Sequence, residues 1–201
     1  ANNTLNRFTA SCGQSVYRGD RLPKDLHGDL FICEPVGRLV RRAKVSNDAG
    51  RIVVSNAYHE NEFIRSSDPN FRPVNSATGP DGCLYIVDMY RGIIQEGNWV
   101  RGGSYLRGVV QEYELDKNVG RGRIFRIDHA TTQRGPQPRM LDETPAQLVA
   151  HLSHPNGWWR SEAQKLIILN GDKSVVPMLE AIVRTSKLPL GRLHALWTLE
   201  G

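Results

Sequence analysis

Short apolar runs rich in β-favouring residues, separated by Gly, Pro, Asn and Asp, fill the chain from its start to about residue 128. Such runs predict strands joined by tight turns. After about residue 141, apolar residues instead recur every three or four positions, which predicts helices. The polar segment 129–140 carries two prolines and predicts a linker. The pattern therefore predicts a β domain over 1–128 and an α domain over 141–201.

The β half contains one strand pattern twice. Each copy has a Gly-Asp or Asp-Gly turn, an apolar strand and a strand that begins with Gly-Arg: GDLFICEP with GRLVRRAKV, then DGCLYIVD with GRIFRID. The segment RIVVSNAYHENEFI adds a fourth strand to the first copy. Four short antiparallel strands per repeat are typical of propeller blades. The predicted fold class is multidomain, β then α, beginning with a partial β-propeller of about two four-stranded antiparallel blades whose ring needs further sequence to close.

The α half predicts four helices. Thr144-Pro145 supplies an N-cap and a first-turn proline, and Asn170-Gly171 supplies a helix end. The helices are expected to begin at Thr144-Pro145, after His154-Pro155, at about Val175 and at Pro189. The Arg-x-x-Ala spacing of 160–163 recurs at 192–195, an offset of 32 residues. This offset favours HEAT-like helix pairs, which bury their faces only against neighbouring repeats.

Charge and cysteine content narrow the function classes. The net charge of +5 permits binding to nucleic acid, but acidic residues intersperse the basic ones and no RNA- or DNA-binding motif accompanies them, so nucleic acid is disfavoured. No apolar run is long enough to span a membrane, and the first ten residues lack the layout of a secretory signal. Without a CxxC or CxxCH motif, we expect no zinc or other metal site and no haem site in this chain.

Two of the three cysteines are expected to face each other. Cys12 and Cys33 fall on strands that we predict to be adjacent and antiparallel, so the geometry allows a disulfide between them. Such a bridge would indicate an oxidising compartment. Cys83 would then remain a buried free thiol.

The connection from Met89 to about Gly120 is too long for a plain hairpin loop and is expected at the same end of the sheet as Arg72 and Asp88. Its aromatic and cationic residues suit a sugar ring or an anionic cofactor. The candidates for substrate are Tyr90, Trp99, Arg101 and Tyr105, and the candidate for cofactor is Arg91. The alternative is a structural cover packed by Trp99 and Tyr105.

Three residues are candidates for a general base at that end of the sheet: Glu34, His59 and Asp88. Each also has a structural interpretation, since a lone His in a strand is commonly a structural residue and an Asp at a strand end commonly caps the next turn. Arg72 precedes Pro73, and this rigid extended pair would direct its guanidinium along the inner strand as an anion clamp.

Several motifs together resemble one family of bacterial proteins classed as membrane-bound dehydrogenases. The motifs are FTASCGQSVYRGDRLP, GDLFICEPVGRLVRR, FRPVNSATGPDGCLYIVDMYRG, GRGRIFRI, HPNGWWRSEAQKLI and LGRLHALWTLEG. The resemblance covers nearly the whole chain. It implies an exported, periplasmic protein whose propeller is similar to soluble quinoprotein glucose and sorbosone dehydrogenases, followed by HEAT repeats and a c-type cytochrome domain.

The resemblance also implies pyrroloquinoline quinone and calcium as cofactors. Arg72 matches an arginine that contacts the anionic quinone in such propellers. The lysine that they place near the end of the preceding blade's second strand has no match, because Cys-Glu-Pro-Val stands at 33–36. The catalytic histidine and the calcium-binding loop belong to earlier blades, so this stretch alone is expected to be inactive.

Two functions follow. The first is an aldose- or sorbosone-type dehydrogenase that holds a sugar, and a quinone, in its propeller and passes electrons to a c-type cytochrome. The second is a non-catalytic propeller and HEAT scaffold that binds a glycan or a protein partner. The missing lysine favours the second.

Overall fold

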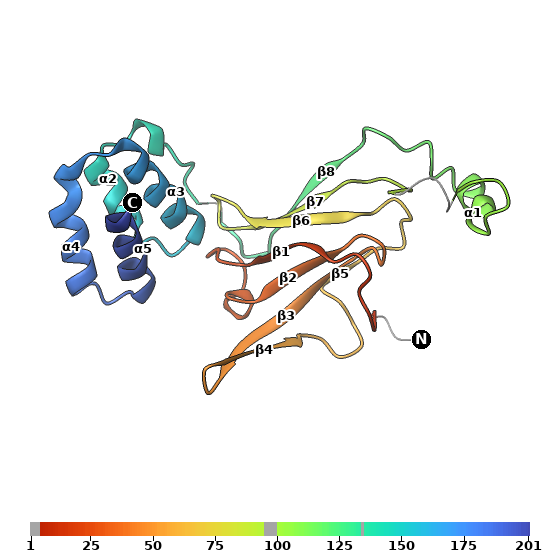
Figure 1. The fold of residues 1–201 in the computed structure, drawn as a ribbon, viewed down its shortest axis with the longest axis horizontal. Helices are drawn as coiled ribbons and strands as arrows, with labels where there is room; N and C mark the ends of the chain where they lie inside the picture. Colours follow the sequence, from red (N-terminus) through yellow and green to blue (C-terminus); the bar gives the residue numbers. More distant parts are fainter. Residues whose placement is uncertain (1–4, 95–99, 134) are drawn as a thin grey trace. The chain divides into compact units, whose positions relative to one another are not determined.

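The computed structural model of the chain describes residues 5–94, 100–133 and 135–201. The chain divides into two compact units. The first, called the β unit, comprises residues 1–17, 26–77 and 84–127. The second, called the helical unit, comprises residues 18–25, 78–83 and 128–201. Two antiparallel sheets occur in the first part of the chain and most helices in the second (Figure 1), so the prediction of a β region followed by an α region is confirmed in this general form.

The first sheet of the β unit has the strand order β1-β2-β3-β4, with β5 also paired to β3. Its strands are β1 (Cys12–Val16), β2 (Leu30–Glu34), β3 (Leu39–Asp48), β4 (Arg51–Asn56) and β5 (Ile64–Arg65). All pairs are antiparallel. The buried aromatic side chains of Tyr17 and Phe31 make an edge-to-face contact beneath this sheet and contribute to its core.

Tight turns fix the register of these strands. Ala49 and Gly50 both have positive φ, 49° and 88°, as a two-residue type I′ hairpin requires, and they join β3 to β4. Gly13 lies in a β-bulge of β1 with φ 52°, and a Cβ there would stand 2.2 Å from the carbonyl oxygen of Val74. Only glycine allows this close approach between β1 and the second sheet.

The second sheet has the order β6-β7-β8, with β6 at Pro73–Thr78, β7 at Leu84–Asp88 and β8 at Arg123–Ile127. The connection between β7 and β8 includes the short helix α1 (Leu106–Glu112). Ile93, Val110 and Leu115 form a small buried cluster within it. The connection therefore has a core of its own, made of aliphatic side chains.

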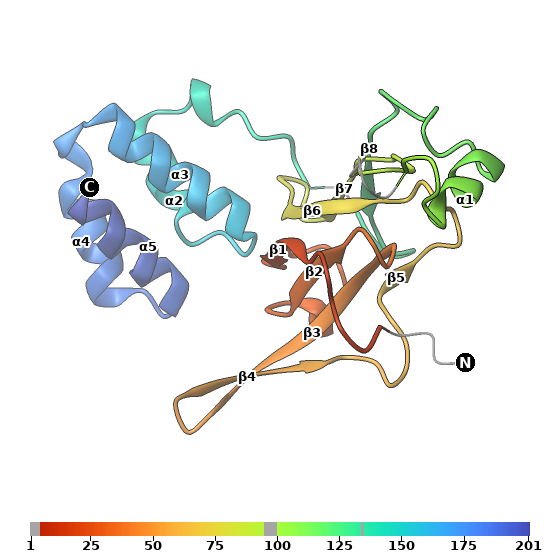
Figure 2. The same cartoon turned by 45° about the vertical axis from the view of Figure 1, so that its right-hand side comes forward.

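The helical unit contains α2 (Pro145–His151), α3 (Gly157–Asn170), α4 (Val176–Thr185) and α5 (Pro189–Glu200). The four helices lie at the predicted positions and form a compact group (Figure 2). Thr144 caps α2 in a capping box with Gln147, and Gly171 ends α3 in the left-handed conformation. Among the described residues, none of the helices has the length and apolar character that a membrane crossing requires.

Two turns from the first half of the sequence belong to the helical unit, namely 18–25 and 78–83. Trp159 donates its indole N–H to the Pro80 carbonyl at 2.8 Å, and the Asn156 side-chain amide donates to the Gly79 carbonyl at 3.0 Å. The Arg18 guanidinium donates to the hydroxyl of Ser161 at 2.6 Å. The residues at the start of α3 therefore bind these turns through both backbone and side-chain groups.

His194 on α5 is 6% exposed. Its Nδ1 lies 2.7 Å from Oε1 of Gln164. Burial, and then the positive charges of Arg160 and Arg18, lower the pKa of His194 from 6.5 to about 4. The imidazole of His194 binds a proton near pH 6.5 in the unfolded chain but not in the folded chain. The free energy of unfolding should therefore include no loss from His194 above that pH. It should fall by up to about 3 kcal/mol as the pH decreases toward 4.

The variant His194→Gln should lose this part of the pH dependence. Urea unfolding of the wild type and the variant, followed from pH 7.5 to 4.5, measures the difference, and His59→Gln serves as the control because His59 is exposed. Equal slopes against pH for the wild type and His194→Gln would contradict the prediction.

Candidate functional site

A cavity of about 610 Å³ lies in the β unit, between the segment before β1, the β2–β3 turn, the start of β6 and the β7–β8 connection. This volume is in the range of small-molecule sites. Its wall is mainly aliphatic, formed by Ala10, Pro35, Val36, Ile93, Ile94, Val100, Leu106, Val109, Val110 and Leu115. The only charged side chains in the described part of the wall are Arg38 and Arg72. A largely apolar cavity with two cations is therefore the candidate site of this unit.

Arg72 holds two walls of the cavity together. Its Nε donates to the carbonyl of Arg91 at 3.0 Å, and its terminal nitrogens donate to the carbonyls of Pro35 and Gly92, each at 2.7 Å. Burial, and then the nearby charge of Arg38, lower the pKa of Arg72 from its ordinary value. The guanidinium thus ties the β2–β3 turn to the β7–β8 connection instead of standing free as an anion clamp.

Glu34 plays a corresponding role at the opposite side of the β2–β3 turn. Its carboxylate is fully buried and accepts the backbone N–H groups of Thr9, Ala10 and Gly37 at 3.1, 2.8 and 2.5 Å. Burial alone would raise the pKa of Glu34, but these hydrogen bonds lower it below its ordinary value. A carboxylate held ionised by so many donors is a poor general base, and its observed function is to fix the segments around it.

Asp88, also fully buried, caps the turn that follows β7. Its Oδ1 accepts the N–H groups of Arg72 and Tyr90 at 2.7 and 2.8 Å, and its Oδ2 accepts Nε of Arg123 at 2.9 Å. Tyr90 has a φ of 47°, and the guanidinium of Arg123 stacks on its ring at 3.6 Å. The structural interpretation of Asp88 is thereby observed directly, and Tyr90 packs against Arg123 outside the cavity wall.

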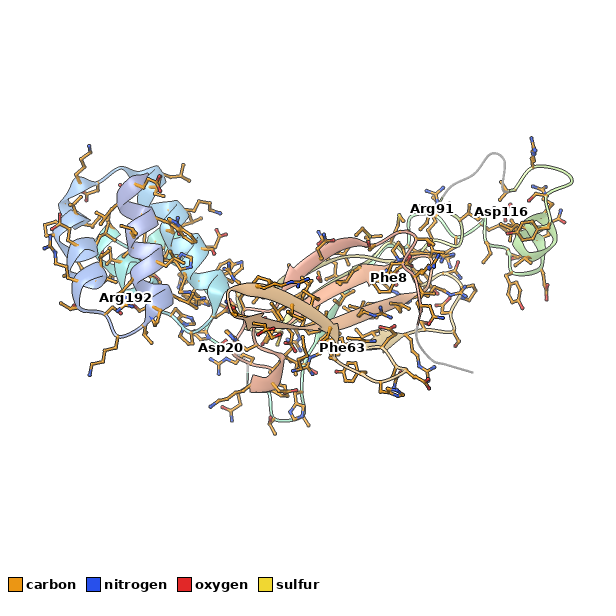
Figure 3. All side chains as sticks on the ribbon, turned by 60° about the horizontal axis from the view of Figure 1, so that its bottom comes forward. Phe8, Asp20, Phe63, Arg91, Asp116 and Arg192 are labelled. Carbon is orange, nitrogen blue, oxygen red and sulfur yellow. The ribbon has the colours of Figure 1, made fainter. Side chains whose placement is uncertain are left out.

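The remaining candidates of the β7–β8 connection do not converge. Arg101 is exposed and Tyr105 is 79% exposed, and neither belongs to the cavity wall. Figure 3 shows two side chains of this connection, Arg91 close to the sheets and Asp116 farther from them. Trp99 lies outside the described residues. Tyr105 does not pack a cover, as the alternative interpretation required, because its side chain is exposed; the buried cluster of this connection is instead aliphatic, made by Ile93, Val110 and Leu115.

His59 is exposed on the segment after β4, and in the described part of the chain neither a hydrogen bond nor an ion pair links it to Glu34 or Asp88. Glu34 and Asp88 both act electrostatically on Arg72, so these three residues do lie in one neighbourhood. The structure thus brings together two of the predicted carboxylates with the predicted arginine, each engaged with the backbone.

Cys12 and Cys33 are direct cross-strand partners in β1 and β2, so the predicted adjacency is confirmed. The disulfide that this adjacency would allow is not formed in the structure, where Cys12, Cys33 and Cys83 are all free thiols. Burial, and then the neighbouring Cys12, raise the pKa of Cys33 to about 12, and burial followed by the charge of Glu34 raises that of Cys12. Because the thiolate is the reactive form, both shifts disfavour oxidation.

The residues present do not fit the quinone that the family resemblance implies. Arg72, which would contact its anionic groups, directs its guanidinium at three backbone carbonyls. Within the described ranges, no group of three or more His, Cys, Asp and Glu residues is placed to hold a metal ion.

Arg38 and the aliphatic wall were not predicted as site residues from the sequence. Arg38 has a φ of 57° in the turn between β2 and β3. An arginine in the left-handed region is uncommon, but that conformation is not visible in a sequence. The apolar residues of 106–115 recur every three to five positions, a spacing from which a buried helix face could have been predicted.

The β unit thus combines two antiparallel sheets with a half-open, mainly apolar cavity, and four helices follow it in the chain. Residues 1–131 match a family described as a domain of unknown function, DUF7133, and the chain belongs to that family. No significant match was found among curated proteins or among solved structures.

Proposed function

We propose that the β unit is a non-catalytic module that binds an apolar small molecule in its cavity. The observation that carries the proposal is the contrast between the wall and the reactive groups. The wall offers aliphatic side chains, whereas Glu34, Arg72 and Asp88 are all occupied by backbone partners. A catalytic site needs acids and bases that can reach a substrate, while a binding site needs only shape, apolar surface and a few polar groups.

We further propose that the two sheets are blades of a propeller and that the helices are HEAT-like repeats. The antiparallel order of each sheet and the pairing of α2 with α3 and α4 with α5 support this architecture. Export to the periplasm, a sugar substrate and electron transfer to a c-type cytochrome remain predictions that rest on the family resemblance.

A cavity-filling variant tests the binding function. Val109 is half-exposed and lines the cavity, so Val109→Trp should fill the space with an indole without overpacking a core. Nile red, a neutral apolar dye, should gain fluorescence with the wild-type protein and lose at least about tenfold in affinity with Val109→Trp. Gln111→Trp places the same indole on α1 outside the cavity wall and should bind the dye as the wild type does.

The same preparation distinguishes a binding module from a quinoprotein. With pyrroloquinoline quinone, calcium and a panel of aldoses added to the complete protein, we expect neither a bound-quinone spectrum nor dye reduction. Turnover would overturn the non-catalytic proposal in favour of the dehydrogenase. Absence of Nile red binding to the wild type would overturn the binding site itself.

A further inference from the structure

The two arginines of the cavity wall differ in what they contact. Arg72 is engaged with three carbonyls of the protein. Arg38 is half-buried, and its guanidinium makes no hydrogen bond or ion pair with any residue that the structure describes; the only bond recorded at Arg38 is the one its backbone carbonyl accepts from Ser66. The wall therefore presents one cation that the described protein does not neutralise.

The electrostatics of this region also favour an added anion. Arg38 acts on Arg72 as a repelling positive charge, since it lowers the pKa of Arg72. Glu34, a buried carboxylate at the end of β2, already accepts three backbone N–H groups from 9–10 and 37. An anion at Arg38 would relieve the repulsion between the two guanidinium groups, and in a partly buried site this effect is stronger than in water.

The remainder of the wall determines what must be attached to that anion. It is mainly aliphatic, and its larger side chains include Ile93, Leu106, Val110 and Leu115. None of the described wall residues is aromatic, so these residues offer no ring on which a sugar could stack. An unbranched hydrocarbon chain matches such a wall through apolar contact alone.

We propose that the cavity binds an aliphatic carboxylate, with the hydrocarbon chain against the aliphatic wall and the carboxylate at Arg38. The planar guanidinium matches a carboxylate through two parallel hydrogen bonds. This inference rests on the proposed binding function and specifies its ligand. It makes Arg38 a determinant of specificity and leaves Arg72 as the residue that holds the walls in position.

The experiment compares dodecanoate, dodecanol and dodecyltrimethylammonium as competitors that displace Nile red. The two ions are used below their micelle concentrations and dodecanol below its solubility limit. Dodecanoate should displace the dye at a concentration at least about tenfold lower than dodecanol, because a charge-assisted hydrogen bond to Arg38 adds to the same apolar contact. Dodecyltrimethylammonium should be the weakest of the three. Equal displacement by the acid and the alcohol would overturn the inference while leaving the binding function intact.

Variants of Arg38 locate the effect. Arg38→Asn removes the charge, and asparagine tolerates the left-handed backbone that this position requires. The advantage of dodecanoate over dodecanol should fall about tenfold in Arg38→Asn and should be largely retained in Arg38→Lys. Arg65→Ala, an exposed arginine of the same sheet, should leave it unchanged. If Arg38→Asn keeps the full advantage at an unchanged urea midpoint, Arg38 is not the contact.

Discussion

Replacing Arg72 with alanine is expected to destabilise the β unit by about 4 kcal/mol, because three backbone carbonyls lose a charged donor at once. These carbonyls belong to Arg91, Pro35 and Gly92, on two segments that have no regular secondary structure to satisfy them. Water can reach part of this site after the truncation, which limits the loss. Urea unfolding at neutral pH measures this loss of stability as a lower unfolding midpoint with an unchanged m-value.

Two further variants make this result specific. Arg72→Lys keeps the charge but presents a single ammonium, which cannot serve three carbonyls in the geometry of a guanidinium, so it should recover no more than about half of the loss. Arg65→Ala, at an exposed position, should change stability by less than about 0.5 kcal/mol. A loss below about 1 kcal/mol in Arg72→Ala would show that water replaces the guanidinium without penalty.

Local sequence signals located the helices after residue 141 and most strands, but they did not predict α1 or the division of 51–65 into β4 and β5. Thr144 and Pro145 mark the start of α2, and Gly171 marks the end of α3, because caps satisfy backbone groups within a few residues of themselves. The apolar runs of 30–34 and 84–88 likewise predicted the strands β2 and β7. These features depend on neighbours in the chain, which a sequence displays directly.

The roles of the candidate site residues were harder to predict from the sequence. Glu34 and Asp88 have the chemistry of general bases. The local cap made by Asp88 was among the predicted interpretations, but the donors Thr9 and Ala10 that converge on Glu34 are remote in the sequence. That convergence depends on the path of segments 9–10 and 35–38, which are distant in sequence. Glu34 and Asp88 therefore hold the segments around the cavity in position. The aliphatic wall of the cavity does not correspond to a sequence motif.

The placement of the turns 18–25 and 78–83 shows the same limit. A change of periodicity near residue 128 separates strands from helices, but it cannot show that two turns from the β half pack with α3. Such contacts join residues that are remote in the sequence, as Pro80 and Trp159 are. The geometry of these contacts depends on how the whole chain folds, so local sequence patterns do not predict it.

Glu34→Gln is expected to cost about 4 kcal/mol, although it changes the side-chain volume hardly at all. Donors approach both carboxylate oxygens, since Thr9 and Ala10 donate to Oε1 and Gly37 donates to Oε2. A glutamine must place its own N–H₂ group against one of these sets, so that donors face donors whichever way the amide turns. Thermal and urea unfolding of this variant should therefore show a loss close to that of Arg72→Ala.

The pH dependence of this loss separates electrostatics from packing. The native pKa of Glu34 lies below its ordinary value of 4.5, so its contribution is complete above that value and disappears as the pH falls through the native pKa. The difference between wild type and Glu34→Gln should consequently shrink as the pH is lowered, because the wild-type carboxylate then becomes neutral too. Glu112→Gln on α1, an exposed position, should show no difference at any pH. A difference for Glu34→Gln that stays constant down to the lowest accessible pH would instead assign its cost to steric misfit at the β2–β3 turn, and would remove Glu34 as the electrostatic anchor of the cavity wall.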